Sequence, residues 1–391
     1  MHAAPIYLDH NATAPMLPEV AEAVREASLR YQGNPASQHE PGRQARRALE
    51  EARQRIGEML DARTGGMDAD RVIFTSGGTE ANNLALSGLL PPPPRPGLVG
   101  AKRLVISAIE HPSVARTAAH QAALGWHVQQ APVDGRGVVQ LDALAELLTP
   151  DTALVSVMLA NNETGVLQPV EQIADACRGR GIPFHTDAVQ AVGKAPVGFQ
   201  QLGVDALTAT AHKLHGPLGI GVLVVRHGVR LAPALHGGFQ QAEARPGTES
   251  AALAIGMMCA LELWQGEAAD RRQRLAFLRD RLEQAIVAGY PAATIIGAGA
   301  PRLPQTSNIA LVGLNRQAVA MALDLAGIAC STGSACASGS SEPSPALVAM
   351  GLPEGQISAS VRFSLGASTT AAEIDEAASR ILSVCNHLRR Q

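Results

Sequence analysis

The sequence predicts an α/β fold: a mostly parallel central sheet with helices on both faces, and a smaller α/β C-terminal domain. Short β-branched runs alternate with helical patterns as far as Val225, and the pattern changes after Ala251. Such alternation is typical of right-handed βαβ units, which build parallel sheets. A chain of 391 residues also exceeds what one compact core usually serves. We therefore expect a large domain over residues 15–256 and a small domain formed by residues 1–14 and 257–391.

The expected strands are short apolar runs that end in turn residues. The first is a brief extended start at Tyr7, which breaks at Asn11 and Pro15. The later ones cover residues 71–74, 104–109, 152–159, 182–187, a run ending at Ala211, 306–312 and 360–365.

The expected helices show apolar residues at helical spacing among charged ones. Turn clusters such as Gly33–Ser37 separate them, and the proline run Pro91–Pro96 predicts a stiff surface loop. The helices are expected over residues 19–30, 42–60, 81–90, 170–180, 251–288 and 316–325, with a last one that ends near residue 390.

Composition excludes several classes of protein. Hydrophobic residues make up 46%, charged residues 17%, and the net charge is −3, so nothing favours nucleic acid or an anionic membrane as a partner. No apolar run approaches the ~18 residues of a membrane span, and the first residues lack the pattern of a signal peptide. Five cysteines without a C-x-x-C pair argue against a disulfide framework or a metal site. We expect a cytoplasmic protein.

Polar residues stand at or just beyond the ends of five consecutive expected strands. Parallel strands present their carboxyl ends at one edge of a sheet, where α/β proteins bind ligands. Taken singly, each residue has an ordinary structural interpretation, such as an exposed lysine or a structural histidine. Together they predict one site. They are Thr79, His111, Asn162, Asp187 and Lys213.

Lys213 stands where a strand runs into a glycine-rich turn, and a lysine there is useful when it binds a carbonyl, above all that of pyridoxal phosphate (PLP). PLP also needs an acid at its pyridine nitrogen, for which Asp187 is the candidate. A carboxylate about 4 Å away supplies roughly 4 kcal/mol at an effective dielectric of 20, or about three pKa units. Arg362 is the candidate clamp for a substrate carboxylate, with a surface ion pair as the alternative.

The run Thr75–Glu80, between a strand and a helix, predicts an anion site. Glycines let the backbone approach closely, and a helix N-terminus favours a phosphate. Gly78 and Thr79 are the candidates, although Thr79 also suits a plain helix N-cap. The run is not a P-loop, because no Lys-Ser/Thr pair follows.

Residues 331–341 are nearly all small and contain Cys336, so we expect a mobile loop with a reactive thiol. Cys330 competes for that role, but it follows an apolar strand directly, so burial is expected. Cys177, Cys259 and Cys385 fall within helical patterns and are expected to be core or inert thiols.

Nearly the whole chain resembles the cysteine desulfurase family, in the PLP-dependent class V aminotransferase group with the type I fold. The residues that carry the resemblance are YLDHNATAP at Tyr7, GNPAS at Gly33, FTSGGTEANN at Phe74, EHPSV at Glu110, NNETG at Asn161, HTDAVQ at His185, HK then GP at His212, GTE at Gly247, GSAC at Gly333, EPS at Glu342 and RFSLG at Arg362.

The resemblance implies a role for each matching residue. Lys213 forms the Schiff base, and Cys336, in the small domain, accepts sulfur as a persulfide. The cofactor would be held at its pyridine nitrogen by Asp187, at its phenolic oxygen by Gln190, over its ring by His111, and at its phosphate by Gly78, Thr79, Thr210, His212 and Thr248, the last from a second subunit. Asn162 and Arg362 would bind the substrate carboxylate.

The chain departs from the family pattern in two places. The family often has Gln-Glu-Arg-Gly after paired glycines. After Gly238 this chain has Phe-Gln-Gln-Ala-Glu-Ala and then Arg245, so the arginine of the family's run is missing. Ala14 replaces a frequent second threonine.

The resemblance further implies removal of sulfur from L-cysteine, giving L-alanine, and a homodimer. The sulfur would pass to an acceptor protein, such as an iron–sulfur scaffold that binds a cluster near Cys336, or to thio-cofactor or tRNA synthesis. A selenocysteine lyase and a class V aminotransferase are alternatives on the same scaffold, and a PLP-binding docking protein is a third. Transamination needs no cysteine, so the Cys336 loop favours sulfur transfer.

Overall fold

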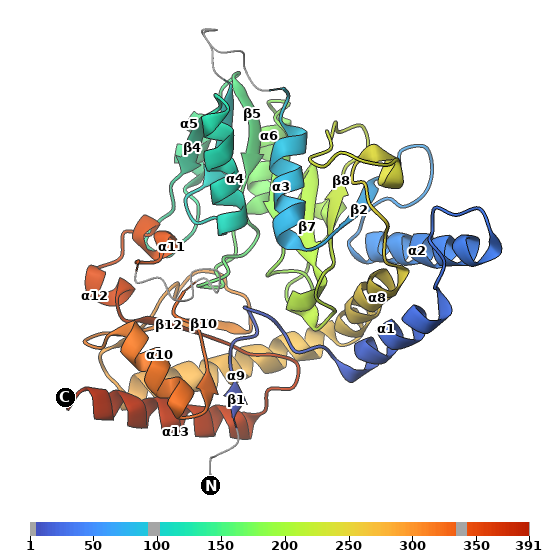
Figure 1. Ribbon diagram of the computed structural model, residues 1–391. Helices are drawn as coiled ribbons and strands as arrows, with labels where there is room; N and C mark the ends of the chain where they lie inside the picture. The colour runs from blue at the N-terminus through green and yellow to red at the C-terminus, as the bar shows by residue number, and fades with distance from the viewer. Residues whose placement is uncertain (1–4, 93–101, 334–341, 391) are drawn as a thin grey trace.

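The structure is a computed structural model that describes residues 5–92, 102–333 and 342–390. A sheet flanked by helices occupies one part of the molecule, and long helices with smaller sheets occupy the other (Figure 1). Across the described residues, no helix combines the length and the apolar character that crossing a membrane requires.

The large sheet has seven strands in the order β2-β8-β7-β6-β5-β3-β4. Only β8 runs antiparallel to its two neighbours, and all other neighbouring pairs of this sheet are parallel. The expected mostly parallel sheet is therefore confirmed. Its strands are β2 (Arg71–Thr75), β3 (Arg103–Ser107), β4 (His127–Ala131), β5 (Thr152–Ser156), β6 (Phe184–Asp187), β7 (Ala206–Thr210) and β8 (Gly221–Val225).

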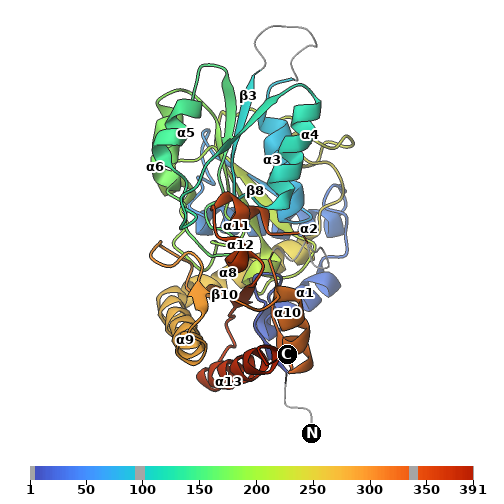
Figure 2. The ribbon, with the colours of Figure 1, turned by 90° about the vertical axis from the view of Figure 1, so that its left-hand side faces the viewer.

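Alternate residues of the strands feed hydrophobic cores on opposite faces of this sheet. On β3, Leu104 and Ile106 pack into one core with Leu84, whereas Val105 joins the other core with Ile173. Figure 2 shows α3 and α4 on one side of the sheet and α5 and α6 on the other. Helices thus cover both faces, as the β-branched strands require. These helices are α3 (Gly78–Leu89), α4 (Pro112–Ala123), α5 (Leu141–Leu147) and α6 (Val170–Arg178).

Further helices precede and follow this layered region. The first two, α1 and α2, both pack against α8. Lys213 lies on η1, a single 3-10 turn directly after β7. The bounds are α1 (Pro18–Arg30), α2 (Glu40–Met59), α7 (Phe199–Leu202), η1 (Ala211–Leu214), η2 (Gln240–Glu243) and α8 (Ala251–Gly266).

The remaining elements form two small sheets with their own helices. An antiparallel sheet has the order β12-β10-β9, and β1 pairs in parallel with β11, so the N-terminal strand joins the C-terminal third. The elements are β1 (Ile6–Tyr7), α9 (Ala268–Gly289), β9 (Ala293–Ile295), β10 (Thr306–Leu311), α10 (Arg316–Leu325), β11 (Ile328–Ala329), α11 (Pro345–Ala349), α12 (Glu354–Ile357), β12 (Ser360–Ser364) and α13 (Ala371–Leu388).

Three expectations about the elements are wrong. The single helix expected over residues 251–288 is two helices, because Glu267 has non-helical dihedrals (φ −119°, ψ 21°) between α8 and α9. The strand expected over residues 104–109 ends at Ser107, and the strand expected over residues 152–159, which is β5, ends at Ser156. The shorter strands leave the following residues to build the site described next.

Candidate active site

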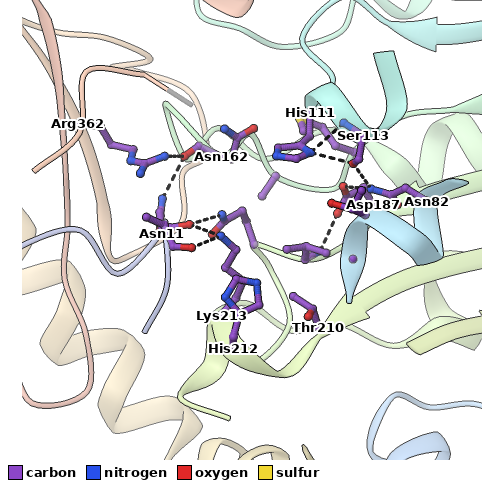
Figure 3. A pocket seen from close by; sticks show the side chains of 17 residues that line it. Asn11, Asn82, His111, Ser113, Asn162, Asp187, Thr210, His212, Lys213 and Arg362 are labelled. Carbon is purple, nitrogen blue, oxygen red and sulfur yellow. Dashed lines mark hydrogen bonds between the residues drawn. The ribbon is translucent and has the colours of Figure 1, made fainter. Parts of the chain in front are cut away.

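A cavity of about 230 Å³ opens at the carboxyl ends of β6 and β7, beside the N-termini of α3 and α4 (Figure 3). This is the edge at which parallel α/β sheets bind ligands. All five strand-end residues predicted from the sequence line it, together with Gly78, Gln190, Thr210, His212 and Arg362. The other lining residues are Asn11, Ala12, Asn82, Ser113, Met158, Ala160 and Val189.

The Lys213 side chain points toward the N-terminal segment (Figure 3). Its Nζ donates hydrogen bonds to the backbone oxygens of Asn11 and Ala12, each at 2.6 Å. The side-chain amide of Gln190 also donates to the Asn11 oxygen, at 3.0 Å. The backbone of Asn11 and Ala12, in the segment that precedes α1, thus orients the side chains of Lys213 and Gln190.

Asp187 ends β6, and both of its carboxylate oxygens accept hydrogen bonds. Oδ1 accepts the Val189 N–H at 2.9 Å, and Oδ2 accepts Nδ2 of Asn82 at 2.6 Å. The same Asn82 nitrogen lies 2.8 Å from Oγ of Ser113. Acceptance of hydrogen bonds from two donors holds this carboxylate in place.

His111 is the N-cap residue of α4. Its Nδ1 accepts the backbone N–H of Ser113 at 3.1 Å and lies 2.8 Å from that serine's Oγ. Because Nδ1 accepts this N–H, Nε2 is the ring nitrogen that carries a proton. Hydrogen bonds therefore connect Asp187, Asn82, Ser113 and His111 in one chain (Figure 3).

Glu110, next to His111, is half-buried, and its carboxyl oxygen Oε2 is fully enclosed by the protein. Its Oε1 accepts hydrogen bonds from the Ser107 hydroxyl at 2.6 Å and from the Met158 N–H at 2.8 Å. These two bonds connect the ends of β3 and β5. Burial raises the pKa of this carboxyl to about 8, and the nearby Asp187 adds to the rise. A carboxyl with this pKa is mostly protonated at neutral pH.

The N-terminus of α3 supports the predicted anion site. The helix begins at Gly78, and its N-cap Gly77 has a φ of 154° and no capping side chain. The alternative that Thr79 is the N-cap is therefore wrong. A Cβ at Gly78 would lie 2.8 Å from Cγ2 of Val189, so only glycine fits without a shift. The first N–H groups of a helix are ready-made donors for a phosphate.

Thr210 and His212 also line the cavity, and Thr210 lies close to Gly77 and Gly78. Oγ1 of Thr210 donates to the Ile220 oxygen at 3.0 Å, and Nδ1 of His212 lies 3.2 Å from Oγ1 of Thr13. Burial, followed by the charge of Lys213, lowers the pKa of His212 to about 4, which keeps its ring neutral near pH 7.

Arg362 on β12 is 1% exposed, so the alternative of a surface ion pair is wrong. Its Nη2 contacts Oδ1 of Asp9 at 2.7 Å, and Nη1 donates to the Asn162 oxygen at 3.0 Å. Its buried Nε has no hydrogen-bond partner among the described residues. This guanidinium joins the N-terminal segment to β12 at one wall of the cavity.

The donor set fits PLP. The cavity offers an amine for the aldehyde, a carboxylate for the pyridinium nitrogen and a helix N-terminus for the phosphate. Oε1 of Gln190 is buried without a hydrogen-bond partner among the described residues, as expected for an atom that faces a polar ligand.

Two predicted site residues lie elsewhere. Thr248 lines a separate pocket with Phe74 and Arg245, so within one chain it is not part of the main cavity. Cys336 lies outside the described residues. Over the described ranges there is no cluster of His, Cys, Asp and Glu side chains able to hold a metal ion.

The sequence reasoning missed four residues that contribute to the site: Asn11, Ala12, Asn82 and Ser113. Asn82 lies one helical turn after Gly78, on the same face of α3, and Ser113 follows a strand-end histidine by two residues. These spacings were available signals. Nothing local in the sequence indicates that Asn11 and Ala12 lie beside a lysine some 200 positions away.

An amine, an acid, an arginine and a phosphate-type helix start around one cavity define a PLP-dependent enzyme of the type I fold. The aminotransferase class-V family matches residues 6–377, and the chain belongs to that family. Within it the chain belongs to the cysteine desulfurases, as the curated relatives below indicate.

The curated relatives match over nearly full length. The chain is 41% identical to a cysteine desulfurase of Trichormus azollae over 386 residues, which cover 98% of this chain and 94% of the relative. It is also 41% identical to the cysteine desulfurase NifS of Azotobacter vinelandii over 387 residues, covering 99% and 94%.

Solved structures agree with this assignment. A NifS-like protein superposes with a TM-score of 0.88 at 30% identity, covering 98% of this chain and all of that one. A structure titled "SspA in complex with cysteine" has a TM-score of 0.78 at 29% identity, covering 93% and 99% of the two chains.

Proposed function

We propose that this chain uses PLP to take the sulfur from L-cysteine, with L-alanine and a persulfide on Cys336 as products. The observation that carries the proposal is the arrangement of Lys213, Asp187 and Arg362 around one cavity beside the N-terminus of α3. The curated names of the relatives and the cysteine-bound structure of SspA support L-cysteine as the substrate.

The residues that would hold PLP follow from their chemistry. Lys213 would bind its aldehyde, Asp187 would pair with its pyridinium nitrogen, Gln190 would face its phenolic oxygen and His111 would stack on its ring. The phosphate would lie at Gly78 and Thr79, with Thr210, His212 and a partner subunit's Thr248 nearby. When bound, PLP supplies an electron sink for the α-carbon of the amino acid.

The substrate carboxylate would bind between Arg362 and Asn162. The buried guanidinium already has an ordered orientation through Asp9, so little side-chain entropy is lost on binding. Lys213, once displaced by the substrate amine, would take the proton from the substrate α-carbon on Nζ. The backbone oxygens of Asn11 and Ala12 lie ready to accept hydrogen bonds from the resulting ammonium.

Sulfur transfer needs a nucleophile, for which we propose Cys336. Its thiolate attacks the substrate sulfur, so a sulfur–sulfur bond forms and the carbon–sulfur bond breaks. The electron pair of the broken bond stays with the substrate carbon, which then takes a proton to become the methyl group of alanine. The sum is L-cysteine plus thiol giving L-alanine plus persulfide, and it needs no external oxidant.

We further propose a homodimer with domains over residues 15–256 and over 1–14 with 257–391. A protein acceptor in the cytoplasm would then take the persulfide sulfur for iron–sulfur cluster, thio-cofactor or tRNA synthesis. Selenocysteine lyase and aminotransferase activities remain the alternatives, because both use the same lysine, acid and arginine.

The deciding experiment mixes the purified PLP-loaded protein with sulfur-labelled L-cysteine. Alanine should form, and mass spectrometry should find labelled sulfur on Cys336. Cys336→Ala should keep the cofactor absorbance and its change on adding substrate, but lose persulfide. Lys213→Ala should lose all turnover and leave no lysine that borohydride links to the cofactor. Alanine without a persulfide, or a keto acid as product, would contradict the proposal.

A further inference from the structure

The side chain of Gln241, on η2, forms a two-point contact with the edge of the large sheet. β2 is the outermost strand of that sheet, and its hydrogen-bonded neighbour is β8. Oε1 of Gln241 accepts the Phe74 N–H at 2.7 Å, and Nε2 donates to the Phe74 oxygen at 2.9 Å. One side-chain amide therefore pairs with this residue of β2 as the backbone of another strand would.

The same stretch of chain also contacts the residues that follow Phe74. These residues, 75–78, are named the phosphate loop because they lead to the start of α3. Arg245 donates from Nε and Nη2 to the two carboxylate oxygens of Glu80, at 2.7 and 3.1 Å. Oε2 of Glu80 in turn accepts the Ser76 N–H at 2.7 Å. The phosphate loop is thus held both before its first residue and within it.

Arg53 on α2 fixes the orientation of the Gln241 amide. Its Nη1 donates to Oε1 of Gln241 at 2.9 Å and to the Val72 oxygen at 2.7 Å, and its Nη2 pairs with Glu249. Its guanidinium carbon lies 4.6 Å from the ring centre of Phe74. An atom that faces a guanidinium and a backbone N–H must be the amide oxygen, so the amide nitrogen faces the Phe74 carbonyl.

The backbone that presents this amide is strained. Gln241, Ala242 and Glu243 have φ angles of 50°, 52° and 65°, in the left-handed region that residues with a Cβ rarely adopt. Such strain persists only where the surroundings hold it in place, and it gathers at functional sites. The strained residues lie in the stretch from Gly238 to Arg245 in which the chain departs from the family pattern.

We propose that Gln241 is a positioning residue for the phosphate of PLP, because by fixing Phe74 it sets where the N–H groups of the phosphate loop meet the anion. This proposal rests on the proposed use of PLP. Hydrogen bonds from a helix start depend on geometry, so a displaced loop loses affinity for the phosphate. Binding of the ring and the aldehyde, at Asp187 and Lys213, does not depend on this contact.

The test compares PLP with pyridoxal, which has the same ring and aldehyde but no phosphate. In Gln241→Ala, the dissociation constant of PLP should rise at least about tenfold, as expected for the loss of two hydrogen bonds, and that of pyridoxal should stay within twofold. Gln241→Glu keeps the size and the acceptor but cannot donate to the Phe74 oxygen. It should show the same selective loss, and it decides the test if Gln241→Ala does not fold.

The matched control is Gln54→Ala, an exposed glutamine on α2 whose amide donates to Glu58. It should bind both ligands as wild type does. An equal loss of affinity for PLP and pyridoxal in the Gln241 variants would mean general damage to the fold and would overturn the proposal. Unchanged affinity for PLP would overturn it as well.

Thr248 lies on the same stretch of chain, so a double variant separates the two residues. In the Thr248→Ala background, Gln241→Ala should still raise the dissociation constant of PLP by the same factor, because independent contributions add. No further loss in that background would show that Gln241 acts through Thr248 rather than through Phe74, and would overturn the proposal.

Hydrogen exchange in the protein without cofactor tests the contact itself. Backbone amides of β2 and the phosphate loop, followed by mass spectrometry of peptides, should exchange at least about tenfold faster in Gln241→Ala, whereas those of β3 should keep their wild-type rate. Unchanged exchange at Phe74 would overturn the proposal. Failure of the wild type to bind PLP would instead overturn the proposed function, and exchange would still test whether Gln241 holds the loop.

Discussion

The two sides of the cavity are built in different ways. On the cofactor side, Asp187, Lys213 and His111 follow strands of one sheet, and neighbouring strands bring them together. On the substrate side, Arg362 meets Asp9 across 353 positions of sequence. Asn11 is tied there by Oγ1 of Thr306 at 2.8 Å and by Oγ of Ser364 at 2.9 Å.

The difference teaches which parts of a site depend on the sheet and which on contacts between distant segments. The cofactor side needs the right strand order and a helix start, with the backbone oxygens of Asn11 and Ala12 orienting Lys213. The substrate side needs β1, β10 and β12 to be correctly placed against one another. Changes on the two sides should therefore affect different observables: cofactor binding for the first, and substrate binding together with folding for the second.

The largest effect is expected on the substrate side. Arg362→Ala removes the proposed carboxylate clamp and leaves Asp9 without its ion-pair partner. We expect kcat/KM for L-cysteine to fall about 10³-fold, and stability to fall by about 3 kcal/mol, as when a buried ion pair loses one member. Steady-state kinetics and denaturant unfolding measure these quantities.

Asp9→Asn is the control for this change. It keeps the guanidinium and removes only the charge that orients it, so its effect on kcat/KM should be much smaller than that of Arg362→Ala. The absorbance of bound PLP should survive in both variants. If Arg362→Ala lost the cofactor as well, the separation of the cavity into two sides would be wrong.

A smaller effect is expected on the cofactor side. Asn82→Ala removes the donor at 2.6 Å from Asp187 and breaks the chain of hydrogen bonds to His111 through Ser113. One such bond to a charged group is worth about 1.5 to 3 kcal/mol, so PLP affinity should fall at least about tenfold. KM for L-cysteine should stay the same.

The matched control for this variant is Asn83→Ala. Asn83 is the next residue on α3, but its side chain donates to the Thr79 oxygen and accepts from Thr117, away from Asp187. Titration of the cofactor-free protein with PLP compares the two. Equal affinities in both variants would show that Asn82 does not support Asp187.

Glu110 allows a third prediction, which concerns stability and pH. Its carboxyl has a pKa of about 8 when folded, against an ordinary value near 4.5. Between these values the folded state holds a proton that the unfolded state lacks, so stability is lost as pH rises from 4.5 to 8. Glu110→Gln has no such proton and should escape this loss.

The measurement is the unfolding free energy of both proteins without cofactor at pH 5 and pH 8. Relative to wild type, Glu110→Gln should gain about 3 kcal/mol between these two pH values. Because the two proteins are compared at both pH values, the contributions of the other titrating groups to the unfolding free energy cancel. Any pH-independent change in stability caused by the glutamine cancels as well. Parallel stability curves would mean that the buried carboxyl does not titrate in this range.

Much of the cofactor side could be predicted from the sequence. Alternation of strands and helices sets a parallel sheet, and a parallel sheet brings strand-end residues to one edge. Thr79, His111, Asn162, Asp187 and Lys213 therefore appear together in the cavity. The glycines at residues 77 and 78 similarly indicate a helix start where the backbone can come close to a bound phosphate.

The substrate side was harder to predict from the sequence, because its contacts join segments that are far apart in the chain. Whether Arg362 forms a surface pair or a buried one depends on β12 lying between β10 and the N-terminal segment. The site role of Asn11 likewise depends on that segment's path. Local patterns also misjudged element ends: the strand expected to reach residue 109 ends at Ser107, where Glu110 turns back to join β3 and β5.

The smallest effect is expected at Cys330, which lies near the substrate side. Burial, with a contribution from Asp9, raises the pKa of this thiol to about 12. At pH 7 only about one in 10⁵ such thiols is ionised, whereas an unperturbed cysteine is ionised to a few per cent. Because the thiolate is the nucleophile, Cys330 is too rarely ionised to compete with an ordinary cysteine for the substrate sulfur. Cys330→Ala should keep kcat and persulfide formation within about twofold of wild type, since it removes one half-buried sulfur atom and no reacting group. Labelled sulfur on Cys330 after incubation with L-cysteine would show that its burial is relieved during turnover, and that the substrate side moves far more than its network of hydrogen bonds indicates.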